Sequence, residues 1–385
     1  MVERLDDVEK LRRASRFGGL DTLRGLAAAA VVWHHSVDNN AVYYGENTYF
    51  SRGIGVTTFF VTSGFLITRI LLREQDKTGN IALGKFWVRR ALRIFPLYFV
   101  ILGIYVLLVA SAQRGTEAGD LFWRNLPYYA TFTTNWFVAE DPGKRIIFFF
   151  AWSMAVQEQF YMLWPTIMKA FARRYAFVFP LAFLLASEAS SQILHLAGRQ
   201  PGLLQHIIAS LDTPIFFGVA AAMVVHSKRA WGFELVHKLA GRIWSLPLAI
   251  ALVLLPRWVP SIPRDVLSLS ICYLVVACVL APPVYLKLIT NSLAAHVGTV
   301  SYGIYLIQSL VLNAVGKVFH EPPPGIAFAI AFPVVVLLAT LSNRYLERPF
   351  MRLREELPKR PLVEAVPAVA PIEPAHAPSA HSLAR

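Results

Sequence analysis

The chain has few cysteines and few charged residues for its length. Two of its 385 residues are cysteine, and both Cys272 and Cys278 lie inside one apolar run. Neither a disulfide framework nor a cysteine metal site is therefore indicated. Charged residues make up 16% of the chain against 56% hydrophobic residues, and the mean hydropathy is positive. This composition excludes an ordinary soluble domain and predicts an all-α, polytopic membrane protein.

Acidic residues are also scarce, since 24 Asp and Glu residues stand against 37 Lys and Arg residues. The net charge of +13 could indicate a nucleic-acid partner. A polytopic membrane protein, however, concentrates Lys and Arg in its cytoplasmic loops, which explains the charge with no nucleic acid. A cleavable signal peptide is not expected, because the N-terminus is polar and the first apolar segment carries Arg24.

The apolar segments predict about ten transmembrane helices. We place them at about residues 19–37, 53–71, 94–111, 148–168, 175–194, 212–225, 243–259, 265–285, 297–315 and 325–343. Lys and Arg favour the inferred inner loops over the outer loops by about three to one, which predicts that both termini are cytoplasmic. The expected organisation is a cytoplasmic segment (1–18), a transmembrane domain (19–350) and a largely disordered cytoplasmic tail (351–385).

Two polar residues interrupt the apolar helix expected at the first span. Arg24 and His35 are eleven residues apart, which puts them on one helix face with about 16 Å between them. A cation and an imidazole in a membrane helix are costly unless they face a protein interior or a wet cavity. We therefore interpret the pair as functional. The alternative is that Arg24 snorkels to the interface and His35 caps the other end.

Six motifs occur in one order along the chain. They are LDTLRGLAAAAVVWHH, GVTTFFVTSGFLIT, FWVRRALRIFPLY, WSMAVQEQFYMLWP, SYGIYLIQ and YLERP. Each is weak alone, but together they resemble the acyltransferase-3 family of integral-membrane O-acyltransferases over about residues 19–350. Members of that family acylate sugars of lipopolysaccharide, exopolysaccharide and lipo-oligosaccharide.

The resemblance implies roles for the polar pair and for two other motifs. His35 and Arg24 match the family's catalytic His and its Arg, so His35 is expected to activate an acceptor hydroxyl or to carry the acyl group transiently. The residues expected to bind acetyl-CoA are Ser63, Arg89, Arg90 and Arg93. Arginine binds phosphate bidentately, although helix packing could explain Ser63 and membrane orientation could explain the arginines.

Two positions depart from the family pattern. Gln157 stands where relatives commonly have Glu, and Glu158 follows it as the carboxylate of that span. Glu158 is expected either to pair with Arg24 or orient His35 as a catalytic residue, or to be a structural buried acid. Gln308 stands where many relatives have His, and it can hydrogen-bond but cannot shuttle a proton. Glu347 is expected on the cytoplasmic side, paired with nearby arginines.

The expected function is acyl transfer, most simply of acetyl from acetyl-CoA to a saccharide hydroxyl, with no metal, in the bacterial inner membrane. One alternative is a transporter of a lipid-linked saccharide, although no pseudo-symmetric halves are visible. A second alternative is an inactive relative that serves as a partner subunit. The acceptor sugar, the oligomeric state, and direct transfer against an acyl-histidine are left open.

Overall fold

The described part of the chain consists of helices. The computed structural model describes residues 17–38, 49–138, 146–171, 178–183, 185–186, 189, 207, 214–227, 230–259, 262–282, 284–285, 290 and 292–356. Every regular element in these ranges is helical, which confirms the all-α prediction. The predicted fifth span (175–194) is described only at residues 178–183, 185–186 and 189, and the tail beyond residue 356 lies outside the described residues.

Three helical stretches in the described ranges are long and apolar enough to cross a membrane. They are Gly53–Thr78, Leu83–Ala112 and Pro324–Leu353. Two helix pairs also qualify if each is one broken span, namely Glu234–Ala240 with Ser245–Leu254, bent by 69°, and Ser292–Thr299 with Ser301–Val318, bent by 74°. The protein is therefore a multi-pass membrane protein with three to five candidate spans, while ten spans and the side of the termini stay predictions.

The first three helices follow the predicted spans, with one correction. Helix α2 (Gly18–Asp38) and helix α3 (Tyr49–Thr78) cover the first two spans. Helix α4 (Leu83–Ala112) begins well before the predicted start at residue 94. The basic segment before that span was predicted to be a loop, and this was wrong. Helix α4 buries Phe86, Ile94 and Leu97 along one side. The arginines between these residues therefore lie on a helix and not in a loop.

The long segment after α4 was predicted to be an outer loop, but it contains helix α5 (Glu117–Ala130) and the short helix α6 (Thr134–Phe137). The Thr116 hydroxyl accepts a bond from the Gly119 amide at 3.1 Å and caps α5. Tyr129 anchors the helix, because its hydroxyl donates to the Ile147 carbonyl at 2.9 Å. Burial raises the pKa of Tyr129 to about 12, so this donor stays protonated.

The remaining helices follow in chain order. They are α7 (Ala151–Ala170), α11 (Pro214–Val225), α12 (Ala230–Ala240), α13 (Ser245–Leu254), α14 (Arg264–Val279), α16 (Ser292–Thr299), α17 (Ser301–Val318), α18 (Pro324–Ser342) and α19 (Arg348–Glu356). A π-helical turn, Asn343–Glu347, joins α18 to α19. Glu347 is buried in that turn, where its carboxylate accepts from Asn343 and Ser342 and the charge of Arg93 acts on it.

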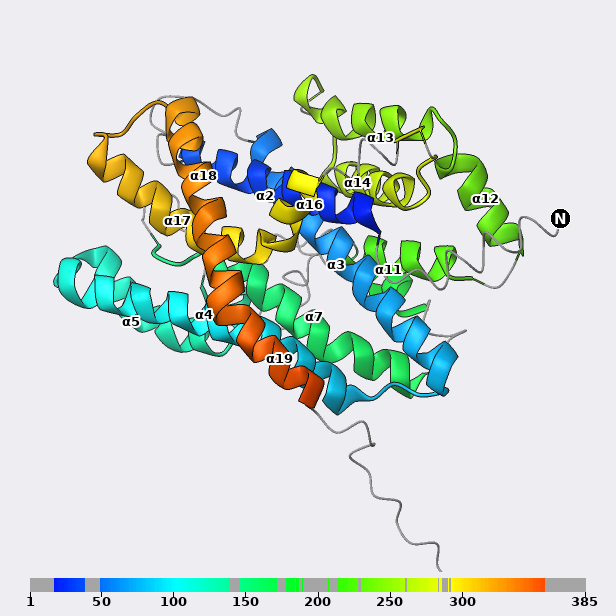
Figure 1. Cartoon of the computed structure of the whole chain (residues 1–385), viewed down its shortest axis with the longest axis horizontal. Coiled ribbons are helices and arrows are strands. Elements are labelled where there is room, and N and C mark those ends of the chain that lie inside the picture. The colour runs from blue at the N-terminus through cyan, green and yellow to red at the C-terminus, as the bar shows by residue number, and fades with distance from the viewer. Residues whose placement is uncertain are drawn as a thin grey trace, which may run out of the picture.

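Two hydrophobic clusters build the interior, and α3 contributes to both. One cluster joins α4, α5, α7, α17 and α18, and it includes Phe60 of α3. The other joins α11, α13 and α14, and it includes Val61 and Phe65 of α3. Figure 1 shows α3 running between α7 and α11. Opposite sides of one helix therefore meet different environments, and the candidate site lies on only one of these sides.

Candidate functional site

The close approach of α2 and α16 fixes the direction of Arg24. A Cβ atom added at Gly298 would overlap the carbonyl oxygen of Asp21, so the two helix backbones are in contact there. Gly25 of α2 faces the same contact, against the Ala294 carbonyl. Arg24 is directed to α17, where its Nη2 donates to the Ser301 hydroxyl at 3.1 Å.

His35 also faces α17. Its Nδ1 lies 3.2 Å from the side-chain nitrogen of Gln308. Because Arg24 meets Ser301 and His35 meets Gln308, the two residues share one side of α2, as the helical spacing predicted. This arrangement places both polar groups against protein, which the membrane environment favours.

A cavity of about 180 Å³ lies where α2, α3, α4, α7 and α17 meet. Three arginines line it, Arg24, Arg90 and Arg93, and no carboxylate is among its lining residues. The positive charges of Arg93 and Arg90 repel the Arg24 guanidinium, while the carboxylate of Asp21 attracts it. An anion bound in the cavity would relieve this repulsion, so the lining favours a ligand with several negative charges.

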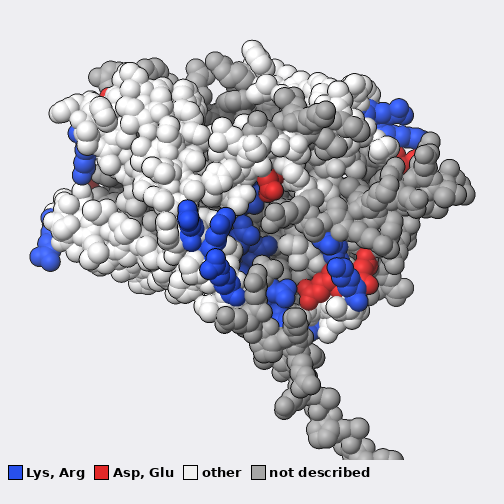
Figure 2. Space-filling view, viewed as in Figure 1, with Lys and Arg blue, Asp and Glu red and all other residues white. Residues whose placement is uncertain are grey.

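Arg90 and Arg93 reach the cavity because they lie three residues apart on α4, on the same side of the helix. The Arg90 guanidinium lies over the Tyr161 ring at 4.8 Å and is held there by a cation–π contact. Arg89 is exposed and does not line the cavity. The structure therefore separates Arg89 from the two arginines with which the sequence grouped it. In Figure 2, basic side chains gather on the lower half of the view, near α19.

Ser63 lines the same cavity and connects α3 to α7. Its hydroxyl oxygen lies 3.2 Å from both the Gln157 amide nitrogen and the Tyr161 hydroxyl, which donate to it. The next residue, Gly64, serves helix packing. A Cβ atom there would lie 2.0 Å from the Ile215 carbonyl oxygen, so the backbones of α3 and α11 are in contact at this point. The motif that contains both residues therefore serves the cavity through Ser63 and helix packing through Gly64.

His35 is half-buried and is not among the residues that line the cavity. The two sites are neighbours along α17. Tyr305 lines the cavity, where its hydroxyl is hydrogen-bonded to Ser153 at 2.5 Å, and Gln308 lies three residues further along the same helix. The seam between α2 and α17 thus runs from the arginine cavity at Ser301 to the imidazole at Gln308.

Glu158 is buried in α7 and is not among the residues that line the cavity. It is 6% exposed, and within the described ranges no hydrogen bond or ion pair joins it to Arg24 or His35. The charge that acts on it belongs to Arg90. Its neighbour Gln157 points into the cavity instead, as the 100° step between successive helical residues requires. The catalytic role of Glu158 stays a prediction.

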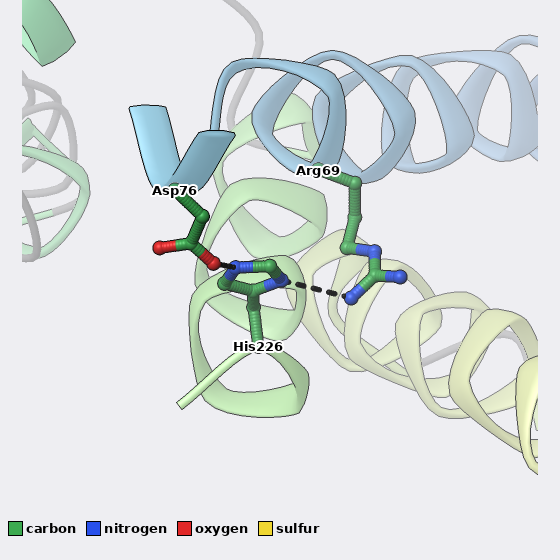
Figure 3. Close-up of polar contacts among 3 residues, drawn as sticks. All are labelled: Arg69, Asp76 and His226. Atoms are coloured by element: carbon green, nitrogen blue, oxygen red, sulfur yellow. Dashed lines mark hydrogen bonds and ion pairs between the residues drawn. The ribbon is translucent and has the colours of Figure 1, made fainter. Parts of the chain in front are cut away.

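A second polar cluster, which the sequence did not predict, lies on the α11 side of α3. Figure 3 shows Arg69 and Asp76 of α3 on either side of His226, which follows α11. Nη1 of Arg69 is 3.0 Å from Nδ1 of His226, and Nε2 of His226 is 2.8 Å from Oδ2 of Asp76. Because the guanidinium can only donate, Nδ1 accepts from it and Nε2–H donates to the carboxylate.

Comparison with known proteins establishes the family. Residues 17–344 match the family described as the acyltransferase domain, so the chain belongs to that family and the resemblance carried by the six motifs is confirmed. No solved structure matches this chain.

Three relatives illustrate the similarity. The peptidoglycan O-acetyltransferase OatA of Listeria monocytogenes is 26% identical over 384 residues, which cover 89% of this chain and 58% of that protein. The "Putative peptidoglycan O-acetyltransferase YrhL" of Bacillus subtilis (strain 168) is 30% identical over 361 residues, covering 86% and 54%. A "Putative O-acetyltransferase" of Staphylococcus aureus (strain COL) is 26% identical over 368 residues, covering 89% and 58%. The chain spans a little over half the length of these relatives.

Proposed function

We propose that this protein transfers an acetyl group from acetyl-CoA to a hydroxyl of a cell-envelope saccharide. The observation that carries the proposal is the cavity with Arg24, Arg90 and Arg93 and no carboxylate in its lining. Coenzyme A presents phosphate and diphosphate groups, which arginine binds with charge-assisted, bidentate hydrogen bonds. Family membership and the O-acetyltransferase names of the relatives support this activity over the transporter alternative.

His35 acts as the base in the proposed reaction. The acceptor hydroxyl oxygen attacks the thioester carbonyl carbon while the imidazole takes the hydroxyl proton. The carbon–sulfur bond then breaks, the coenzyme A thiolate leaves and receives that proton, and the saccharide keeps the acetyl ester. Arg24 stabilises the phosphate end of the donor.

The donor and the base are expected to meet along the seam between α2 and α17. The cavity reaches Ser301 and Tyr305, and Gln308 contacts His35 on the same helix. Eleven residues of helix between Arg24 and His35 correspond to about 16 Å. An extended thioester arm held at its phosphate end by the arginines would therefore point along the seam towards His35.

The proposed location is the bacterial inner membrane, with both termini in the cytoplasm. In this orientation, acetyl-CoA enters from the arginine side, and His35 lies in the outer half of the bilayer. The acceptor is an envelope saccharide or glycolipid on that outer side. The acetyl group would then cross the membrane during transfer.

The test replaces His35 with Ala and uses His34→Ala as the matched control. Acetylation of peptidoglycan, surface polysaccharide and glycolipid is measured by mass spectrometry, alongside the amount of protein in the membrane. We expect His35→Ala to reduce acetylation by about 10²- to 10⁴-fold at unchanged protein level, because general-base catalysis contributes that much. We expect His34→Ala to stay within a few-fold. Undiminished acetylation by His35→Ala would refute the proposal.

A further inference from the structure

The surroundings of His35 define which of its ring nitrogens holds a proton. Nδ1 lies 2.9 Å from the backbone carbonyl oxygen of Val31, one turn earlier on α2. A carbonyl oxygen can only accept, so this bond requires Nδ1 to carry a hydrogen. In the neutral imidazole the lone pair is then on Nε2, the nitrogen that can take a proton from a substrate.

Gln308 supplies the second contact at Nδ1, and it is fully buried. As placed, its amide nitrogen faces Nδ1 at 3.2 Å and the Ser309 hydroxyl at 3.1 Å, while its Oε1 is buried with no hydrogen-bond partner among the described residues. Two N–H groups facing each other repel, and a buried acceptor without a partner costs about 1–3 kcal/mol.

Exchanging the two ends of the Gln308 amide removes the repulsion between N–H groups at Nδ1 and gives Oε1 hydrogen-bond donors. The oxygen and nitrogen of an amide have nearly the same shape, so their assignment follows from the hydrogen-bond network. With Oε1 facing His35, the oxygen accepts from Nδ1–H and from the Ser309 hydroxyl. The Val31 carbonyl and Oε1 then share one donor, and both favour the same tautomer.

We propose that Gln308 is a positioning residue that holds His35 in the Nδ1–H tautomer and leaves Nε2 as the base. The inference rests on the proposed function for its catalytic consequence, but its structural content is independent of activity. A neutral amide orients the ring without the charge of a carboxylate partner. His34 is a titratable neighbour, with its ring centroid 4.9 Å from that of His35.

The direct test is a nitrogen NMR spectrum of the full-length protein in lipid nanodiscs, labelled with ¹⁵N at histidine. The His35 signals are assigned by comparison with His35→Gln. The spectrum is recorded at a pH where the ring is neutral, and the chemical shifts of the two ring nitrogens show which of them carries the hydrogen. We expect Nδ1 to be protonated in the wild type. In Gln308→Leu the Val31 carbonyl still accepts from Nδ1–H, so we expect part of the Nδ1–H population to be lost to the Nε2–H tautomer. Protonation of Nε2 in the wild type, or unchanged populations in Gln308→Leu, would overturn the inference.

Kinetics of acetyl transfer from acetyl-CoA provide the second readout. We expect Gln308→Leu to lower kcat about tenfold or more while KM for acetyl-CoA stays within twofold, and the control Asn313→Leu on the same helix to change neither. Gln308→Glu restores an acceptor with a negative charge, which favours the protonated imidazole. The acid limb of its pH profile should therefore move up by about one pH unit.

The two hypotheses fail in different ways. If no variant and no wild-type sample transfers acetyl, but the spectrum shows the Nδ1–H tautomer and its partial loss in Gln308→Leu, the proposed function is wrong and the positioning of His35 stands. If acetyl transfer is present and Gln308→Leu retains full kcat, the positioning role is wrong.

Discussion

The two sides of α3 differ in the surroundings that they provide for polar side chains. On the α11 side, helix backbones are in contact at Gly64. Arg69 is hydrogen-bonded there to His226, which is hydrogen-bonded in turn to Asp76. On the α7 side, Ser63 faces a cavity with three arginines and no carboxylate in its lining.

This difference separates an arginine whose charge has polar partners inside the protein from arginines that line a cavity. Arg69 is 2% exposed and donates to His226, which in turn donates to Asp76, so the positive charge has polar partners inside the protein. Arg24 and Arg93 lie at the cavity with charges that repel each other. No carboxylate lines the cavity beside these arginines, which makes that side the candidate site for an anionic ligand.

The strongest test of the packed side is Gly64→Ala. A Cβ atom at Gly64 would lie 2.0 Å from the Ile215 carbonyl oxygen, so the backbones of α3 and α11 must separate. We expect a loss of about 3 kcal/mol in the free energy of unfolding, the upper part of the range for overpacking. Thermal unfolding of the purified protein measures it. Gly103→Ala is the control, since nothing lies within 4 Å of a Cβ there, and it should leave stability equal or slightly higher.

We expect His226→Leu to cause a smaller loss in the free energy of unfolding. This substitution leaves Arg69 and Asp76 without the imidazole between them and should lower stability by about 1–3 kcal/mol. Acetyl transfer per folded molecule should be unchanged, because the cluster lies on the side of α3 away from the cavity. The milder control is Asp76→Asn, whose amide oxygen can still accept from Nε2–H. A loss of turnover in His226→Leu with full stability would contradict the division between the two sides.

Much of the site could be predicted from the sequence because helical geometry is local. The eleven-residue spacing put Arg24 and His35 on one face, and both contact α17. The spacing did not reveal which helix that face meets, since Ser301 and Gln308 are more than 270 residues away in the chain. Glu158 lies one step round α7 from the cavity, and its nearest partners likewise depend on packing.

Other features depended on contacts that the sequence does not encode locally. The contact between Arg69 and His226 was not predicted, because the two residues are 157 positions apart in the chain. Arg89 was grouped with Arg90 and Arg93, although it is exposed on another side of α4. The bend of 74° between α16 and α17 was also not predicted. Gly298 lies two residues before Val300, but in the structure it serves the contact with Asp21.

The most direct test of the central claim is the affinity of coenzyme A for the purified protein, measured by calorimetry in lipid nanodiscs. Arg93→Gln removes a guanidinium from the cavity, and Arg89→Gln removes its exposed neighbour as the matched control. We predict that Kd rises about tenfold in Arg93→Gln, which corresponds to the loss of one charged hydrogen bond, and stays within twofold in Arg89→Gln. Equal affinities for the wild type and Arg93→Gln would contradict the assignment of the cavity as the donor site.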